Sequence, residues 1–129
     1  MISFVRGIVA EKSENMVVID CNGMGYEINV SSFTLDTLTR GEEATIKTYL
    51  QVREDGVALF GFVDLKEKEI FLKLINISGI GPKMAITILS QISIKDLVSA
   101  ISTGNTKMLS GVLKQYVPLQ ETSDLLFST

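Results

Sequence analysis

The chain has 129 residues and a net charge of −3, with one Cys, no His and no Trp. Without His there is no Ser-His-Asp triad and no His-ligated zinc or haem. Cys21 alone can form neither an intramolecular disulfide nor a Cys₄ metal site, so we expect no cofactor and no resident metal. No apolar run approaches the ~18 residues of a transmembrane helix, and residues 1–7 lack a signal-peptide layout. These features predict a soluble, cytoplasmic protein without membrane contact.

The charges are distributed unevenly along the chain. Residues 1–63 contain five Lys/Arg and nine Asp/Glu, which gives −4, whereas residues 64–129 contain seven Lys and six Asp/Glu, which gives +1. An acidic first half and a basic second half favour two domains with different partners, 1–63 and 64–129. Ordinary variation of surface charge explains a difference of this size equally well.

The first half has the pattern of short strands. Apolar or alternating runs lie at 2–10, 16–20, 25–30, 44–52 and 57–63. Asn22-Gly23 is a turn signal, and Asp55-Gly56 is typical of a type I′ hairpin turn. Residues 32–39 form a loop or short helix between strands. Because five short strands need their edges paired, a small closed or nearly closed β-barrel is predicted.

The second half has helical periodicity. Asp64 can cap a helix, with Glu67 completing a capping box, and Leu65, Ile70 and Leu74 fall near helical spacing. Pro82 favours the first turn of a second helix. Further helices are expected from Ser93, with Leu97, Val98 and Ile101 facing inward, and around Met108–Val112. The fold class is therefore mixed, with β-structure first and an all-α region after it.

Two glycines separated by one residue lie between the first two predicted helices, in Gly79-Ile80-Gly81-Pro82-Lys83. Glycine lets a turn reach positive φ and lets another molecule approach the backbone. The free N–H groups at the start of the second helix and the Lys83 ammonium favour one phosphate, while Ile80 points inward. This stretch resembles the helix-hairpin-helix motif, which grips DNA backbones. A structural turn between helices, capped by glycine, is the alternative.

Adjacent carboxylates occupy the second candidate site, in Arg53-Glu54-Asp55-Gly56. On spacing alone, a preferred Asp-Gly turn with a solvated Glu54 explains the pattern. A Mg²⁺ site is disfavoured because no third acidic residue lies nearby in the sequence.

Several motifs occur together in a fixed order: Ile-x-x-Val-Arg-Gly at 2–7, Gly-x-Gly-Tyr-Glu at 23–27, Val-Arg-Glu-Asp-Gly at 52–56, Leu-Phe-Gly-Phe at 59–62 and Ile-Ser-Gly-Ile-Gly-Pro-Lys-x-Ala at 77–85. Over about residues 1–112 the chain resembles the RuvA family, whose members bind Holliday junctions in bacterial branch migration. The resemblance implies an OB-fold barrel in residues 1–63, used for oligomerisation and for the junction centre, followed by a helix-hairpin-helix DNA-binding domain.

The resemblance also implies roles and partners. Glu54 and Asp55 would form an acidic pin at the crossover with Arg53 beside them, and the 79–83 turn would hold a duplex arm through Gly79, Ile80, Gly81 and Lys83. The expected assembly is a homotetramer, or two tetramers face to face, on a four-way junction. The ATPase RuvB would drive branch migration in recombination and repair, and the resolvase RuvC is a further expected partner. The protein itself would not be an enzyme.

The family pattern is incomplete after Leu109. A second Gly-x-Gly hairpin is expected there, but residues 110–118 read Ser-Gly-Val-Leu-Lys-Gln-Tyr-Val-Pro. The C-terminal domain that engages the motor is not recognisable either. Without the second hairpin, the duplex grip should be halved, and without that domain the motor coupling should be lost.

Two other functions fit parts of the sequence. A generic single-strand binder would use the barrel aromatics Phe4, Tyr26, Tyr49, Phe60 and Phe62 as stacking platforms. A DNA glycosylase would need a catalytic acid, for which Asp96 is the one downstream candidate, although a first-turn acid following Ser93 is better explained by helix capping. No Gly-x₄-Gly-Lys-Ser/Thr motif is present for an ATPase.

Overall fold

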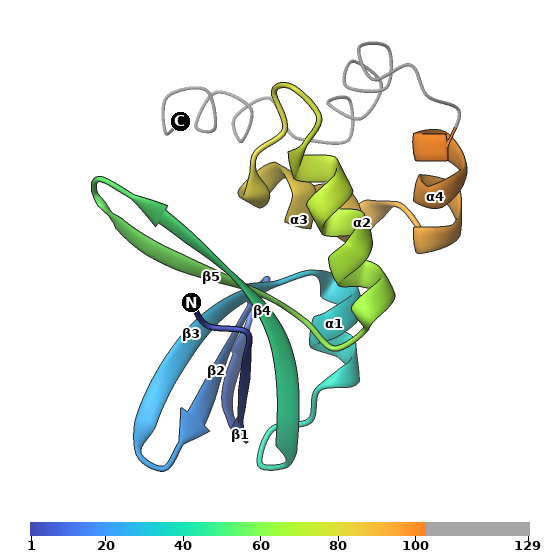
Figure 1. Cartoon of the computed structure of the whole chain (residues 1–129). Helices are drawn as coiled ribbons and strands as arrows, with labels where there is room; N and C mark the ends of the chain where they lie inside the picture. Colours follow the sequence, from blue (N-terminus) through green and yellow to red (C-terminus); the bar gives the residue numbers. More distant parts are fainter. Residues whose placement is uncertain (103–129) are drawn as a thin grey trace. The chain divides into compact units, whose positions relative to one another are not determined.

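A computed structural model describes residues 1–102 of the chain (Figure 1). Its elements are β1 (Phe4–Ser13), β2 (Met16–Cys21), β3 (Met24–Val30), α1 (Ser32–Thr37), β4 (Glu43–Arg53), β5 (Gly56–Phe62), α2 (Leu65–Ile75), α3 (Pro82–Gln91) and α4 (Ile94–Ser102). The chain divides into two compact units, Met1–Lys68 and a second that begins at Glu69. The predicted fourth helix at Met108–Val112 lies outside the described residues.

The first unit is a closed five-stranded barrel with the strand order β1-β2-β3-β5-β4. β1 closes it by pairing antiparallel with both β2 and β4. β5 pairs antiparallel with β4 but parallel with β3, because α1 and β4 lie between β3 and β5 in the sequence. Closure through the pairing of β1 with β4 leaves no open edge in the body of the barrel, as five short strands require. This order, with a helix between the third and fourth strands, is the OB-fold, and it confirms the predicted fold class.

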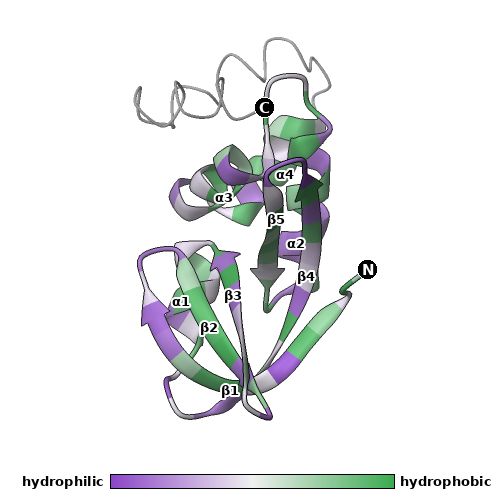
Figure 2. Cartoon of the chain, turned by 90° about the vertical axis from the view of Figure 1, so that its left-hand side faces the viewer, coloured by the Kyte–Doolittle hydropathy of each residue, from purple (hydrophilic) through white to green (hydrophobic). Residues whose placement is uncertain are grey.

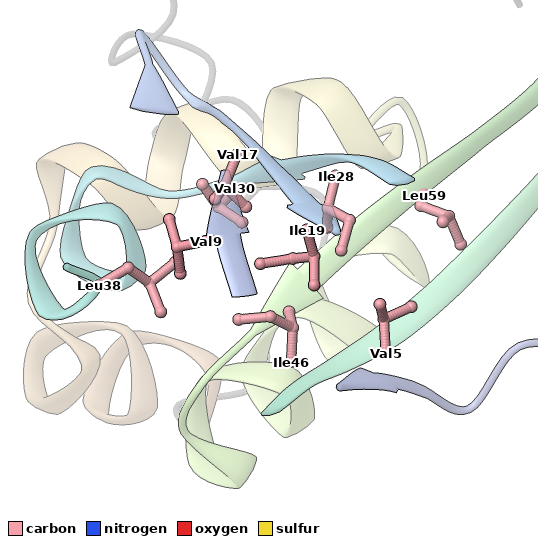
Figure 3. Packing of buried hydrophobic residues seen from close by; sticks show 9 residues of the cluster. All are labelled: Val5, Val9, Val17, Ile19, Ile28, Val30, Leu38, Ile46 and Leu59. Atoms are coloured by element: carbon pink, nitrogen blue, oxygen red, sulfur yellow. The ribbon is translucent and has the colours of Figure 1, made fainter. Parts of the chain in front are cut away.

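The barrel interior is filled by aliphatic side chains from every strand. Figure 3 shows eight of them, Val5, Val9, Val17, Ile19, Ile28, Val30, Ile46 and Leu59, together with Leu38 from the end of α1. Alternate residues along each strand point to opposite faces, so hydrophobic and hydrophilic positions alternate along the ribbons in Figure 2. The period-two alternation that the sequence shows at 25–30 and 44–52 is therefore the pattern of a filled small barrel.

Close packing of the barrel shows most clearly at two glycines. A Cβ on Gly7 would collide with the backbone carbonyl of Asp20 on the neighbouring strand. A Cβ on Gly61 would lie 2.5 Å from methyl groups of both Ile28 and Ile46. These two positions admit no side chain unless a strand moves.

The start of α2 differs from the predicted capping box. Asp64 does cap the helix, since its Oδ1 accepts the Lys66 N–H at 2.9 Å. The Glu67 carboxylate, however, is fully buried and accepts hydrogen bonds from the hydroxyls of Ser31 and Thr34, at 2.6 Å each. Ser31 is also the N-cap of α1, where it accepts the Thr34 N–H. Glu67 thus ties the first turn of α2 to the first turn of α1.

Burial acts on this carboxyl group. Loss of water raises the pKa of Glu67 above the ordinary 4.5, and the two hydroxyl hydrogen bonds offset part of that rise. The nearby negative charge of Asp64 adds to the rise. The site therefore favours the protonated form more than water does.

The second unit has the predicted helical faces, with one exception. Buried residues recur at helical spacing in Ile70, Phe71, Leu74, Met84, Ala85, Ile88, Leu89 and Leu97. Val98 was expected to face inward but is 38% exposed, so that prediction was wrong. Ser93 caps α4 as predicted, because its Oγ accepts the Asp96 N–H.

Within residues 1–102, no single helix is long and apolar enough to cross a membrane. α3 and α4 together reach that length and composition, but the chain bends by 118° between them.

Candidate nucleic-acid interface

The first candidate site is the end of a two-stranded arm. β1 pairs with β4 only as far as Lys47, and β3 pairs with β5 only from Leu59 onward. Beyond those rows, within residues 1–102, β4 and β5 pair only with each other, down to Arg53 opposite Gly56. Figure 1 shows this hairpin continuing past the other strands. The barrel therefore holds the turn at the end of a short projecting ribbon, which we call the β4–β5 arm (residues 51–58).

The turn at the end of the arm is not the predicted type I′ turn over Asp55-Gly56. Its two central residues are Glu54 and Asp55, and Gly56 is already the first residue of β5. A type I′ turn needs positive φ at both central residues, but neither Glu54 nor Asp55 has it; among these residues only Gly56 does, at +150°. The two carboxylates are thus set side by side at the outermost point of the arm.

Charge at the arm tip is only partly compensated. The Arg53 Nε lies 3.7 Å from the Asp55 Oδ1, with the two side chains 40% and 82% exposed. An ion pair this exposed contributes little stability, so its effect is mainly to place one positive charge beside two negative ones. The tip presents a net negative charge to any approaching molecule.

The second candidate site is the turn between α2 and α3. Ile77 and Ile80 are buried, and the Ile80 N–H donates to the Ile77 carbonyl at 3.1 Å. These contacts fix the turn from the inside, as predicted for the Ile80 side chain. Gly79 is exposed and has a φ of +85°, a conformation that disfavours any residue with a Cβ.

Gly81 has a different role from Gly79. It is the N-cap of α3 with φ −92° and ψ 174°, so its backbone is extended and does not use the positive φ that glycine permits. Its N-cap position has no side-chain hydrogen bond, and a Cβ built on it would meet nothing within 4 Å. Gly81 thus leaves open space beside the backbone, while Gly79 allows the chain to turn.

The start of α3 carries a positive electrostatic potential. Pro82 has no N–H. The first backbone hydrogen bond of the helix is the one that the Ala85 N–H donates to the Gly81 carbonyl, at 3.0 Å. The preceding N–H groups lie at the positive end of the helix dipole, where anions bind. Lys83 is exposed in the same turn and adds a full charge. This geometry suits one phosphate group.

The structure places the predicted site residues in two groups. Arg53, Glu54 and Asp55 lie together at the arm tip in the first unit, and the 79–83 turn lies in the second unit. Phe60 and Phe62, offered as stacking platforms, are buried in the fold and cannot stack on bases. Asp96 is a first-turn residue of α4, as the capping interpretation predicted.

Two surface features were not found from the sequence. Val52 and Val57 are directly opposite each other on the arm and each is 70% exposed. The Arg6 guanidinium lies 5.7 Å from the centre of the Phe4 ring and donates a hydrogen bond to the Thr45 hydroxyl. These residues line a groove of about 360 Å³, together with Lys47 and Lys68. Strand pairing creates both features, so no local motif could have indicated them.

An OB-fold barrel followed by helices that are joined through a glycine turn defines a class of nucleic-acid-binding architecture. Two family models match this chain accordingly. The RuvA N-terminal domain matches residues 1–61, and a SAM-like helix-hairpin-helix tandem matches residues 71–112.

Curated relatives point the same way. The Holliday junction branch migration complex subunit RuvA of Bacteroides fragilis is 44% identical over 112 residues, that of Bacteroides thetaiotaomicron is 46% identical over 112, and that of Thermoanaerobacter sp. is 44% identical over 111. These matches cover 85–87% of this chain and 56–59% of the relatives. The chain belongs to the RuvA family, and it spans little more than half the length of these relatives.

Proposed function

We propose that this chain is a non-catalytic, structure-specific DNA-binding subunit that binds four-way junctions in the cytoplasm and supports branch migration. Residues 1–63 serve oligomerisation and the junction centre, and residues 64–129 hold duplex DNA. Glu54 and Asp55 form an acidic pin with Arg53 beside it. Gly79, Gly81 and Lys83 receive a phosphate, and Ile80 holds their turn in place.

The opposite charge of the two exposed turns is the observation that carries this proposal. Phosphates are attracted to the start of α3 and to Lys83, whereas they are repelled by the carboxylates at the arm tip. A protein that needed only affinity for DNA would gain nothing from acidic residues on a projecting turn. Repulsion becomes useful where several strands converge and must be kept apart.

Oligomerisation follows from the geometry of the ligand. A four-way junction has four similar duplex arms, and a four-fold ring presents one copy of the same site to each arm. Binding of a single phosphate is weak. When several copies of the site are held at the spacing of the arms, binding of one arm raises the effective concentration of the next arm at its own site, so the overall affinity rises. We therefore propose a homotetramer, or two stacked tetramers, that cooperates with a RuvB-type ATPase and a RuvC-type resolvase.

Competition binding tests the proposal. The protein is titrated against a labelled four-way junction, a duplex of the same sequence and the single strand, at one fixed salt concentration, because phosphate contacts make affinity depend on salt. The proposal expects the junction to bind tightest at every sequence tried. Equal affinity for junction and duplex, or tighter binding of the single strand, would refute it.

Light scattering on the same sample tests the assembly. A mass near four or eight times 14.1 kDa is expected. A monomer at high micromolar concentration, with and without junction, would contradict the tetramer.

A further inference from the structure

The β4–β5 arm carries an exposed apolar pair directly behind its acidic tip. Val52 and Val57 are partners in the strand register, one row before Arg53 and Gly56. Each is 70% exposed. We call these two residues the valine pair.

The valine pair continues an apolar face that begins in the barrel core. Side chains alternate along a strand, so Val52 and Val57 share a face with the next-but-one row, Leu50 and Leu59. Leu59 belongs to the buried core cluster, and Leu50 packs against it. The face is therefore covered at its base and open to water at its end, where no other strand of residues 1–102 pairs with the arm.

The charge around the valine pair limits what can cover it. Glu54 and Asp55 lie within five residues of both valines along the chain, and Arg53 offsets only one of their charges. Over a Debye length of about 10 Å at 0.1 M salt, they repel phosphates from this end of the arm. The part of DNA that can approach is the uncharged part, the faces of the bases. In duplex DNA those faces are stacked on each other, whereas at a strand crossover they can be unstacked.

We propose that the valine pair is an apolar contact surface for unstacked bases at the centre of a four-way junction, an inference that rests on the proposed function. The carboxylates keep the phosphate backbones apart, and the methyl groups of Val52 and Val57 replace the stacking interactions that the opened bases give up. The tip thus combines repulsion of the backbone with attraction of the bases.

The test uses Val52→Thr/Val57→Thr, which keeps the β-branched shape but replaces one methyl group on each residue by a hydroxyl. The probe is a synthetic four-way junction with 2-aminopurine, an adenine analogue whose fluorescence rises on unstacking, at the crossover. Wild type at saturation should raise the fluorescence, and the double variant should lose most of that rise. Junction affinity should fall roughly threefold to tenfold, because less apolar surface is buried against the bases.

Val98→Thr is the matched control, because Val98 is an exposed valine on α4 outside both candidate sites. It should leave fluorescence and affinity as in wild type. Circular dichroism and thermal melting check the fold, and the single variant Val57→Thr serves if the double variant melts early.

The outcomes separate this inference from the proposed function. If wild type does not prefer junction over duplex, the proposed function fails. If it prefers junction but the double variant unstacks the probe as fully as wild type, the valine pair does not contact bases. If the double variant instead changes the mass in light scattering, the pair lies between copies of this chain, and the inference is overturned.

Discussion

The two proposed DNA-contacting turns are built in opposite ways. The arm tip presents side-chain charge, negative and exposed, on a ribbon that the barrel holds by strand pairing. The 79–81 turn presents backbone, with Gly79 at a φ of +85° and open space beside Gly81, and its positive potential comes from a helix start and Lys83. The properties of the arm tip come from the charged side chains that it carries, whereas those of the 79–81 turn come from the absence of side chains at its two glycines.

This difference suggests how a DNA-binding protein recognises a shape. The open backbone at Gly81 and the Lys83 ammonium form what we call the phosphate cradle. Such a cradle would bind any duplex, because every nucleotide has a phosphate. A negative tip fits only where the ligand has a gap between its strands. Under the proposed function, structure specificity comes from what the acidic tip excludes, while affinity comes from the phosphate cradles.

The largest effect is expected where the barrel that holds the arm is damaged. Gly7→Ala places a methyl group against the Asp20 carbonyl, which is backbone and can move only with its strand. Overpacking of this kind costs about 3 kcal/mol of unfolding free energy. Chemical denaturation should show the midpoint falling strongly. Gly23→Ala is a control, since its Cβ meets nothing and only its positive φ is strained; an equal loss there would contradict the packing explanation.

A second large effect is expected at Glu67. Glu67→Ala leaves the buried hydroxyls of Ser31 and Thr34 without their acceptor, at a cost of about 2 kcal/mol. Glu67→Gln keeps an acceptor and should cost less. Urea denaturation of the three proteins at pH 7 measures the difference. If both variants are equally destabilised, loss of volume rather than loss of hydrogen bonds explains the effect.

The pH dependence of stability should identify the same group. Because the pKa of Glu67 is raised in the folded state, the folded protein binds its proton more tightly than the unfolded chain. Its contribution to stability is therefore fully present below the ordinary value of 4.5 and is lost as pH rises through the raised pKa. The wild type should lose stability relative to Glu67→Gln over that window. If the difference in unfolding free energy between the two proteins stays constant from about pH 4 to 7, the pKa of Glu67 does not change on folding.

The sequence was most informative where structure is local. Apolar or alternating runs located all five strands, and the residues that begin helices, Asp64, Pro82 and Ser93, were found because capping depends on neighbours. Glu67 was misassigned because its partners, Ser31 and Thr34, lie more than 30 residues away. The valine pair was not found for the same reason, since its exposure depends on where β1 and β3 stop pairing.

The site was predictable in residue type but not in conformation. Gly-x-Gly indicated an open turn, yet only the backbone shows that Gly79 supplies the positive φ and Gly81 the open space. Similarly, Asp55-Gly56 indicated a hairpin but not that Glu54 and Asp55 are its central pair. Turn type depends on the register of the strands that the turn joins, which pairing along the whole barrel decides.

Removing the charge of the arm tip should weaken discrimination rather than affinity. Glu54→Gln/Asp55→Asn should bind the junction as tightly as wild type or more tightly, because repulsion of phosphates is removed. Its preference for junction over duplex should fall by roughly fivefold, since one close charge pair in water contributes about 1 kcal/mol. Parallel titrations of junction and duplex measure the ratio. An unchanged preference would mean that the carboxylates serve only the turn.

Filling the open space beside Gly81 should instead weaken affinity and leave the preference for junction over duplex unchanged. Gly81→Val adds a side chain where the phosphate must approach, but its φ of −92° is ordinary and no atom lies within 4 Å of the new Cβ. The melting temperature should therefore stay near that of wild type, while affinity for junction and duplex falls together. Gly79→Ala is the matched contrast: it should lower stability by about 1 kcal/mol, because of its positive φ.

The smallest effect is expected from the lysine of the cradle. Lys83→Ala removes one exposed charge and one phosphate partner per subunit, so binding should weaken equally for every DNA sequence. The slope of log affinity against log salt should fall by roughly 0.9 for each phosphate that the protein no longer neutralises. Gly81→Val should weaken binding more than Lys83→Ala, because its side chain blocks the approach of the phosphate. It should change the slope less, because it removes no charge. If Lys83→Ala instead abolishes binding and Gly81→Val is tolerated, the turn holds DNA through the lysine alone, and the backbone contributes no cradle.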